Sequence, residues 1–171
     1  MPLFIDGETR MTESAAICKY LALRHSPGVL NVGVDEPAFG SYLNYLHMGE
    51  ATLTFPQTLV LRYSRFEPPG RLQHQVAEDY SKWFLSCLRT LEPHLAAHEF
   101  LCAVRFTAAD VSVGYAAMLA ESLGLDEWFT PAVLAYWQRL KLRPAFARSL
   151  VAQNDAAVAQ GVSPIPATEA S

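Results

Sequence analysis

The residues best suited to bind a small charged molecule are Glu13 and Ser14, which open a predicted helix just after a turn. The first N–H groups of a helix have no partner within it and carry a partial positive charge, so Ser14 and the amides beside it suit a carboxylate. The Glu13 carboxylate offers an acceptor for an ammonium group. The pair could therefore hold a molecule with both charges on one carbon. On the residue pattern alone, a plain helix cap by Ser14 is the preferred interpretation.

A second candidate pair, His94 and His98, stands four residues apart on a predicted helix. Two histidines at this spacing can share a metal ion. Glu99 is the one nearby candidate for a third ligand, and Pro93 disturbs the same turn. We therefore predict solvated histidines and no metal site.

Cys18, Cys87 and Cys102 are far apart, odd in number and without metal-ligand spacing. This usage favours a reducing compartment over a disulfide framework. All three are predicted to be core thiols. Cys18 lies one turn into the first helix and could act as a nucleophile, but a buried structural thiol is the preferred interpretation.

The segment from Phe106 to Leu125 carries the strongest helix signal in the chain. Thr107 can cap the first turn, Asp110 can reach back to the Thr107 amide, and Phe106 can pack on Val111, which makes a capping box with a hydrophobic staple. The residues beyond the cap are apolar nearly all round, which predicts a helix buried inside a bundle. We assign Phe106, Thr107 and Asp110 to folding and not to chemistry.

The N-terminal residues predict a β-hairpin followed by a helix. Residues 2–5 form a short apolar run, Asp6-Gly7 is a tight-turn signal, and residues 10–12 lie on the far side. A helix from Glu13 or Ser14 then ends near His25, before a linker rich in Pro and Gly. This arrangement would place Glu13 and Ser14 at the start of a helix that lies next to the hairpin.

Helical periodicity dominates the rest of the chain. Gly49 and Pro56 predict a bend in the first of these helices, and Pro131 suits the first position of another. Helices are expected at about 35–66, 71–98, 107–123, 131–142 and 144–152. The domain division predicted is 1–26, a linker at 27–34, an all-helical domain at 35–153 and a flexible tail at 154–171.

Composition limits the possible partners. The chain has 171 residues, 51% of them hydrophobic, and a formal charge of −4, with no basic run. A nucleic acid or an anionic membrane is therefore not expected as a partner. No apolar run approaches the ~20 residues that span a bilayer, and no leader is recognised. These features predict a cytoplasmic protein of one compact domain or slightly more.

Several motifs resemble those of the cytosolic glutathione S-transferases. The N-terminal motifs resemble the second half of that family's thioredoxin-like domain, and the later ones resemble two helices of its all-helical second domain. They occur in the family's order from residue 1 to about 152. The matching runs are 1–7, 11–17, 20–22, 106–111 and 143–146.

The resemblance implies a mainly α fold, in which a partial thioredoxin-like hairpin and helix precede a five-helix bundle. It implies glutathione as co-substrate, with Glu13 and Ser14 on the γ-glutamyl group. Pro2, joined to Met1 by a cis bond, would set the backbone for the cysteinyl part, at a cost of about 0.5–1 kcal/mol over trans. An electrophile would occupy an acceptor pocket, and the full-length parent would be a homodimer active in detoxification. The residues implied for that pocket are Tyr42, Tyr45, Met48 and Thr52.

The chain also departs from the family pattern. The family's first strand, helix and second strand have no counterpart here, and the catalytic Tyr, Ser or Cys lies in that segment. The run 103–105, Ala-Val-Arg, stands where the family often has Gly-Asp. We therefore expect a truncated transferase with little activity of its own. The alternative is a non-catalytic binding or interaction module of the same fold.

Overall fold

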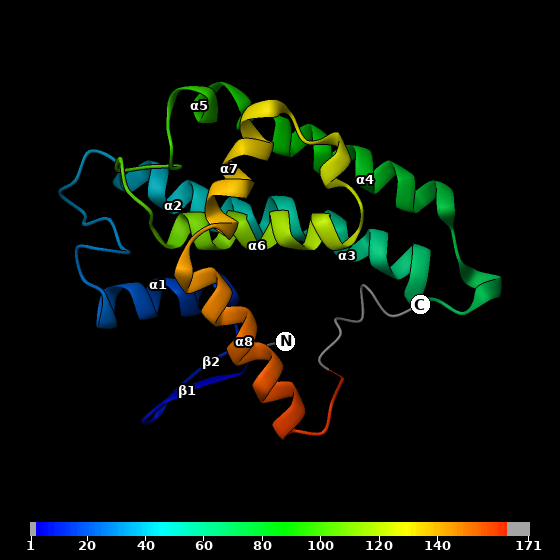
Figure 1. Ribbon diagram of the computed structural model, residues 1–171, viewed down its shortest axis with the longest axis horizontal. Helices are drawn as coiled ribbons and strands as arrows, with labels where there is room; N and C mark the ends of the chain where they lie inside the picture. Colours follow the sequence, from blue (N-terminus) through cyan, green and yellow to red (C-terminus); the bar gives the residue numbers. More distant parts are fainter. Residues whose placement is uncertain (1–2, 164–171) are drawn as a thin grey trace.

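The computed structural model describes residues 3–163 and begins with the predicted hairpin (Figure 1). Strands β1 (Phe4–Asp6) and β2 (Thr9–Met11) pair antiparallel around a two-residue turn. Gly7 has a φ of +59° in that turn, a conformation that glycine adopts without steric cost. Helix α1 (Ser14–His25) follows directly. The register pairs Phe4 with Met11, Ile5 with Arg10 and Asp6 with Thr9.

Polar and aromatic contacts hold α1 against the hairpin. The Tyr20 hydroxyl donates to the Asp6 carboxylate at 2.8 Å, and Arg24 Nε lies 3.2 Å from the same carboxylate. The Phe4 ring meets Tyr20 edge-on, with 5.8 Å between ring centroids. The hairpin therefore packs on α1 as one unit.

The second long helix is interrupted where the sequence predicts a bend. Pro56 lacks an N–H and cannot extend the regular ladder, and the Thr54 hydroxyl donates to the Gly49 carbonyl at 2.7 Å. The interruption takes the form of a π-helical stretch, a type that inserts an extra residue into a helix. The consecutive segments are α2 (Phe39–His47), the π-helical η1 (Met48–Thr54), α3 (Phe55–Leu61) and the π-helical η2 (Arg62–Phe66).

One predicted helix is two helices in the structure. The expected element at 71–98 is divided into α4 (His74–Arg89) and α5 (Glu92–Ala97). The cause is Pro93, which cannot donate to the Arg89 carbonyl and would crowd the preceding turn. The residues before α4 form a short 3₁₀ turn, η3 (Pro69–Arg71).

The last three helices follow the predicted order. Helix α6 (Ala108–Ser122) leads through a 3₁₀ turn, η4 (Asp126–Trp128), to α7 (Pro131–Lys141) and α8 (Pro144–Ala159). The sequence-based end of the last helix near residue 152 is wrong, because the backbone ladder of α8 continues to Ala159. Small residues such as alanine favour helix even without an apolar face. The expected tail from 154 therefore begins too early.

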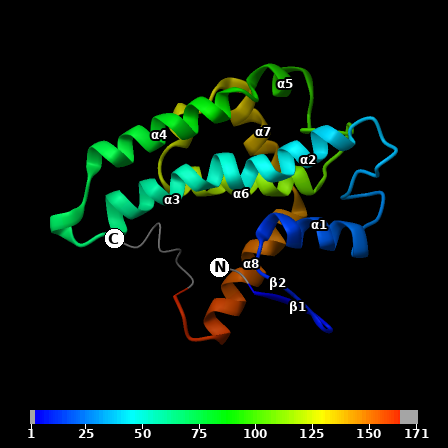
Figure 2. The same ribbon diagram turned by 180° about the vertical axis from the view of Figure 1, so that it is seen from behind.

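Helix α6 lies at the centre of the molecule (Figures 1 and 2). It packs along α2 and η1 on one side, while α1 and α7 contact it elsewhere. The closest approach is at Gly49, where a Cβ would lie 2.3 Å from the Ser112 Oγ. Only glycine allows this crossing. The mainly α fold class, with a hairpin and helix before a helical bundle, is confirmed.

The segment between α1 and α2 is anchored to the loop before α6. The Arg105 guanidinium donates to the Asn31 carbonyl and pairs with both oxygens of Glu36, each at 2.9 Å. The Ala108 amide donates to the Leu30 carbonyl at 2.8 Å. These contacts join the N-terminal unit to the bundle, while the boundaries proposed for the two domains remain a prediction.

Candidate functional site

The N-terminus of α1 is open to solvent. Glu13 and Ser14 are both exposed, and Glu13 makes no capping bond with its side chain. The first ladder bond of the helix runs from the Ile17 amide to the Glu13 carbonyl. Within residues 3–163, the amides of Ser14 and Ala16 have no hydrogen-bond partner. A carboxylate from a ligand could accept these N–H groups and the Ser14 hydroxyl.

The structure adds a residue that the sequence does not reveal. Glu50, in the π-helical η1, accepts the Ala15 amide through its carboxylate at 3.1 Å. A side chain of the bundle thus caps the helix that carries Glu13 and Ser14. The pair is separated by 35 positions, and no local motif marks Glu50 as a cap. The only sequence signal is its place in the interrupted helix between Gly49 and Pro56.

Cys18 lies on the same helix but is poorly suited to nucleophilic chemistry. The side chain is half-buried. Burial, followed by the negative charge of Glu50, raises the pKa of the Cys18 thiol. A thiol that remains protonated is a weak nucleophile. Cys87 is also half-buried and Cys102 is buried, in agreement with the interpretation of all three as structural thiols.

The four residues implied for an acceptor pocket differ in burial. Tyr42 is buried in the core, and burial raises the pKa of its hydroxyl. Tyr45 is half-buried and lies against His94, with 5.8 Å between ring centroids. Met48 and Thr52 are half-buried further along the helix. Their role in binding an electrophile remains a prediction, and Met1 and Pro2 lie outside the described residues.

The capping box at α6 is complete. The Ala109 amide donates to the Thr107 hydroxyl at 3.3 Å, and the Thr107 amide donates to Asp110 at 2.8 Å. Asp110 also accepts from the Leu101 amide and from the Tyr136 hydroxyl. Burial raises the pKa of Asp110, while its donors act in the opposite direction. The assignment of Thr107 and Asp110 to folding therefore has a full structural explanation.

Phe106 stabilises the loop through ring contacts. Its ring meets Phe100 edge-on at 6.1 Å, and the Arg143 guanidinium lies 3.6 Å from the ring centroid. A cation at this distance over an aromatic face is attracted by the ring quadrupole. Val111, the partner expected for a hydrophobic staple, is more than one-third exposed.

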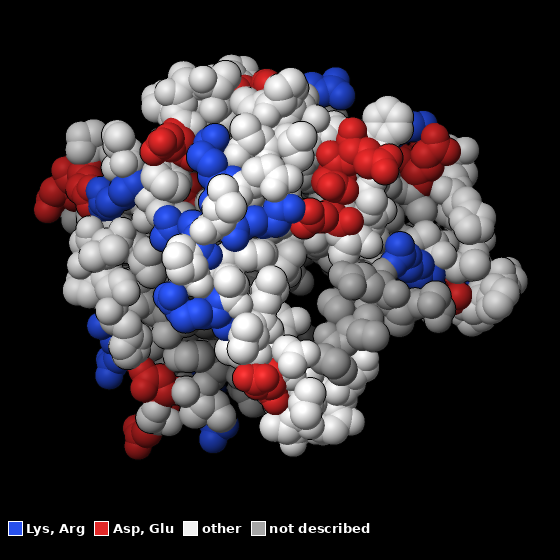
Figure 3. Space-filling model, viewed as in Figure 1, with Lys and Arg blue, Asp and Glu red and all other residues white. Residues whose placement is uncertain are grey.

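Basic side chains on one face of the molecule lie among acidic ones (Figure 3). Several are paired within the protein: Lys141 with Glu121, Arg105 with Glu36, and Arg139 with the Glu99 carbonyl. Pairing of basic side chains with carboxylates reduces the positive surface potential that would attract a polyanion.

Two further observations concern ligands and membranes. No group of three or more His, Cys, Asp or Glu side chains in residues 3–163 is arranged to hold a metal ion. In the same range, no helix combines the length and apolarity required to cross a membrane.

Comparison with known proteins identifies similar chains. No family model matches the sequence. The chain is 25% identical to glutathione S-transferase 3 of Zea mays over 162 residues, which cover 89% of this chain and 71% of the maize protein. Ure2p5 from Phanerochaete chrysosporium, cocrystallized with 1-(S-glutathionyl)-2,4-dinitrobenzene, superposes with a TM-score of 0.77 at 25% identity. The match covers 89% of this chain and 72% of Ure2p5.

A sphingomonad glutathione S-transferase complexed with glutathione shares the fold with a TM-score of 0.75 at 20% identity. That match covers 89% of this chain and 73% of the sphingomonad protein. The hairpin, the helix carrying Glu13 and Ser14, and the capped helix α6 thus occur together in the arrangement of these enzymes. The chain is therefore similar in sequence and in fold to glutathione S-transferases.

Proposed function

We propose that this chain binds the γ-glutamyl end of glutathione at the N-terminus of α1, as part of a glutathione transferase. The observation that carries the proposal is the exposed start of that helix, where Glu13 and Ser14 lie beside amides without partners. The ligand carboxylate would accept from Ser14, and its ammonium group would face Glu13. Ligand-bound relatives such as Ure2p5 support the choice of glutathione over other amino-acid-like molecules.

The reaction of such an enzyme is conjugation. The glutathione thiol loses its proton to solvent, and the thiolate forms a bond to an electrophilic carbon. The leaving group departs with the electron pair of the bond that breaks. The unperturbed thiol has a pKa of about 8.5, so an enzyme must favour the thiolate at neutral pH.

We further propose that the 171-residue chain by itself conjugates slowly or not at all. The residues that match the family do not include its thiol-activating Tyr, Ser or Cys. Cys18 is not proposed to replace that group, because it is a half-buried thiol within α1. Turnover of chlorodinitrobenzene with glutathione, followed as formation of the conjugate, tests this statement. A rate well above the uncatalysed reaction would contradict it while supporting a transferase function.

Glu50 is proposed to position the site. Its bond to the Ala15 amide fixes the start of α1, and its charge adds to that of Glu13 in attracting an ammonium group. We expect Glu50→Gln to weaken glutathione binding and to increase amide hydrogen exchange in the first turn of α1. Exchange in α7 serves as the control, because α7 packs mainly on α5, α6 and α8 and not on the η1 segment that carries Glu50. Unchanged amide hydrogen exchange in α1 of the Glu50→Gln variant would contradict the proposed positioning role of Glu50.

Calorimetric titration with glutathione tests the proposed site directly. Ser14→Ala and Glu13→Gln are expected to weaken binding about 5- to 15-fold, the effect of losing ~1–1.5 kcal/mol from a hydrogen bond. Ser86→Ala and Glu8→Gln are matched controls, since both residues are exposed and lie outside the site. The dipeptide Cys-Gly, which lacks the γ-glutamyl group, should bind much more weakly than glutathione.

Equal effects of the site and control variants would contradict the proposed site. Absence of glutathione binding at millimolar concentration would favour the alternative, a non-catalytic interaction module. We propose that the complete enzyme is a cytoplasmic homodimer, as implied by the family resemblance.

A further inference from the structure

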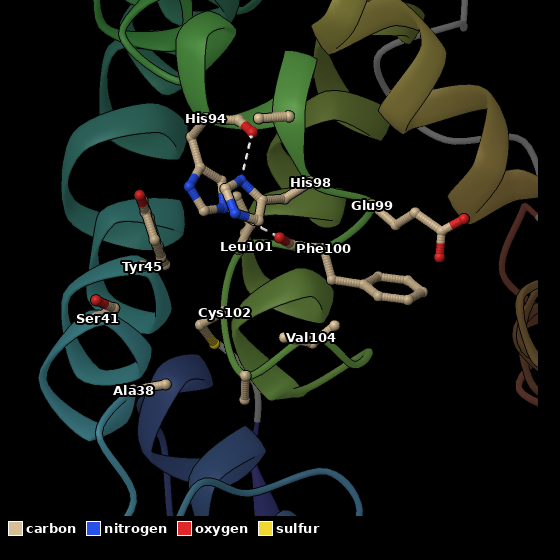
Figure 4. Close-up of a pocket in the computed structure, with 12 residues that line it drawn as sticks. Ala38, Ser41, Tyr45, His94, His98, Glu99, Phe100, Leu101, Cys102 and Val104 are labelled. Carbon is tan, nitrogen blue, oxygen red and sulfur yellow. Dashed lines mark hydrogen bonds between the residues drawn. The ribbon is translucent and has the colours of Figure 1, made fainter.

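A cavity of about 510 Å³ lies between α2, α5 and the loop before α6 (Figure 4). Its volume falls in the range of about 300–1,000 Å³ that is usual for small-molecule sites. None of the described residues that line it belongs to α1 or η1. The cavity is therefore distinct from the candidate glutathione site.

Two stacked imidazoles form one wall of this cavity. The rings of His94 and His98 lie 4.4 Å apart at an interplanar angle of 12°. His94 Nε2 is 3.0 Å from the Phe100 carbonyl oxygen, and His98 Nδ1 is 3.0 Å from the His94 carbonyl oxygen. A carbonyl oxygen only accepts, so each of these two nitrogens carries a proton. In the neutral rings, His94 Nδ1 and His98 Nε2 therefore keep a lone pair for a ligand.

The geometry of the pair favours an organic ligand over a metal ion. Lone pairs on imidazole lie in the ring plane, and the two planes are nearly parallel, so the free nitrogens of His94 and His98 do not converge on one point. No third metal ligand completes a cluster within residues 3–163. The free nitrogens are instead arranged as separate hydrogen-bond acceptors.

Ser41 and Tyr45 of α2 also line the cavity, and the Tyr45 ring lies beside that of His94 (Figure 4). The Tyr45 hydroxyl makes no hydrogen bond within the described part of the chain, and burial raises the pKa of this phenol. It therefore remains a protonated donor available to a ligand. Among the described lining residues, Glu99 is the one with a fixed charge, so the cavity disfavours anions.

The loop that closes the cavity is strained. Ala103 and Val104 have φ values of 55° and 52°, and both residues line the cavity. A β-branched residue is rarely found in this left-handed region, and such strain concentrates at binding and active sites. Hydrogen bonds of the adjacent Arg105 to Glu36 and Asn31 hold the loop in place.

We propose that this cavity binds a flat, uncharged heteroaromatic ring whose edge carries an N–H donor and an acceptor nitrogen. The N–H of the ligand donates a hydrogen bond to a free imidazole nitrogen. The acceptor nitrogen of the ligand accepts a hydrogen bond from the Tyr45 hydroxyl. The site adds a second ligand to a protein whose proposed glutathione site lies elsewhere.

Benzimidazole is a suitable probe, because it has both edge groups, and 1-methylbenzimidazole is the matched ligand without the N–H. The chain contains five histidines, whose ring signals can be followed by NMR after ¹³C labelling of histidine. A titration of the full chain with benzimidazole should shift the signals of His94 and His98 saturably, and leave the other three unchanged. 1-Methylbenzimidazole should bind about 5-fold more weakly, the usual effect of one hydrogen bond.

Variants locate the ligand within the cavity. Ala97→Phe places a ring inside the cavity and should abolish binding, whereas Ala96→Phe adds the same ring on a neighbouring exposed residue that does not line it. Tyr45→Phe removes one hydroxyl and should weaken binding about 3- to 10-fold. The signals of the remaining histidines report whether each variant keeps its fold.

Several results would overturn the proposal. These are an absence of saturable shifts up to the solubility limit of benzimidazole, equal shifts at all five histidines, or equal affinities of the two benzimidazoles. Equal binding by Ala97→Phe and Ala96→Phe would also overturn it. If Ala97→Phe fails to fold, the comparison of Tyr45→Phe with the unmodified chain decides.

Discussion

The Tyr136 hydroxyl donates to the Asp110 carboxylate at the centre of the bundle, with 3.1 Å between the two oxygens. Both side chains are buried, and the same carboxylate accepts the amides of Leu101 and Thr107. One carboxylate thus joins α6, α7 and the loop before α6. Burial also raises the pKa of Tyr136 well above its ordinary value, so this hydroxyl remains a donor at neutral pH.

Removal of this carboxylate should be strongly destabilising. Asp110→Ala leaves several buried donors without an acceptor, and we expect a loss of about 3–5 kcal/mol in the free energy of unfolding. Tyr136→Phe removes a single donor and should cost about 1–2 kcal/mol. Urea denaturation of both variants measures which substitution lowers the free energy of unfolding more. A smaller loss for Asp110→Ala than for Tyr136→Phe would be inconsistent with the network.

The strained loop offers a stabilising substitution. Val104 is 94% exposed with a φ of 52°, so glycine would relieve strain without loss of packing. The left-handed region costs an L-residue about 1–2 kcal/mol. Glycine avoids this cost but loses more conformational entropy on folding, which offsets about 0.5–1 kcal/mol of the gain. We expect Val104→Gly to stabilise the protein by about 0.5–1 kcal/mol in urea denaturation. Val34→Gly, at another exposed valine without positive φ, should not stabilise.

The start of α7 predicts a pH-dependent effect. Glu92 accepts the Ala132 and Val133 amides and the Thr130 hydroxyl, and the Thr130 bond is the main reason that the pKa of Glu92 lies below its ordinary value of 4.5. A carboxyl with a lowered pKa stabilises the fold above its unfolded-state pKa, and this contribution is lost as the pH falls through the folded-state value.

Glu92→Gln should therefore have a lower Tm than the unmodified chain at pH 7. The difference should shrink as the pH falls below 4.5, the ordinary value for this carboxyl. Thermal unfolding at pH 7, 5, 4 and 3 measures it. Glu78→Gln, at an exposed residue of α4, is the matched control. A difference that grows on acidification would show that the charge of Glu92 is not what holds α7.

The hairpin should promote self-association. Leu3 and Ile5 are 65% and 52% exposed, and β1 pairs with β2 alone in the described sheet. An exposed apolar strand edge is a template for pairing with another chain. Ile5→Lys should shift the protein toward monomer in light scattering, whereas Val158→Lys on α8 should not. A monomer at all concentrations for the unmodified chain would contradict this prediction.

Local chemistry made much of the fold predictable. The hairpin turn at Gly7, the capping box of Thr107 and Asp110, and Pro131 in the first turn of α7 all act within a few residues of one another. Their effects do not depend on distant packing. The break caused by Pro93 belongs to the same class, although the regular apolar spacing on both sides of it favoured one long helix.

The remaining features depend on contacts between distant segments. Glu50 caps α1 across 35 positions, and Glu92 caps α7 across about 40. Neither carboxylate differs in sequence from an ordinary surface residue. The same limit applies to Tyr42 and Tyr45, three residues apart on one helix, because the sequence does not show that the first is buried in the core and the second lies against His94.

The π-helical stretch at Met48–Thr54 has a consequence for the evolution of this protein. An extra residue in a helix is equivalent to an insertion, and its deletion would restore regular α-helical hydrogen bonding. Such a deletion would also turn the following residues by about 100° around the helix axis. Glu50 and Gly49 could then not both keep their present partners on α1 and α6. A shorter chain could thus gain a more regular helix and lose, in a single step, the contact that supports the proposed glutathione site.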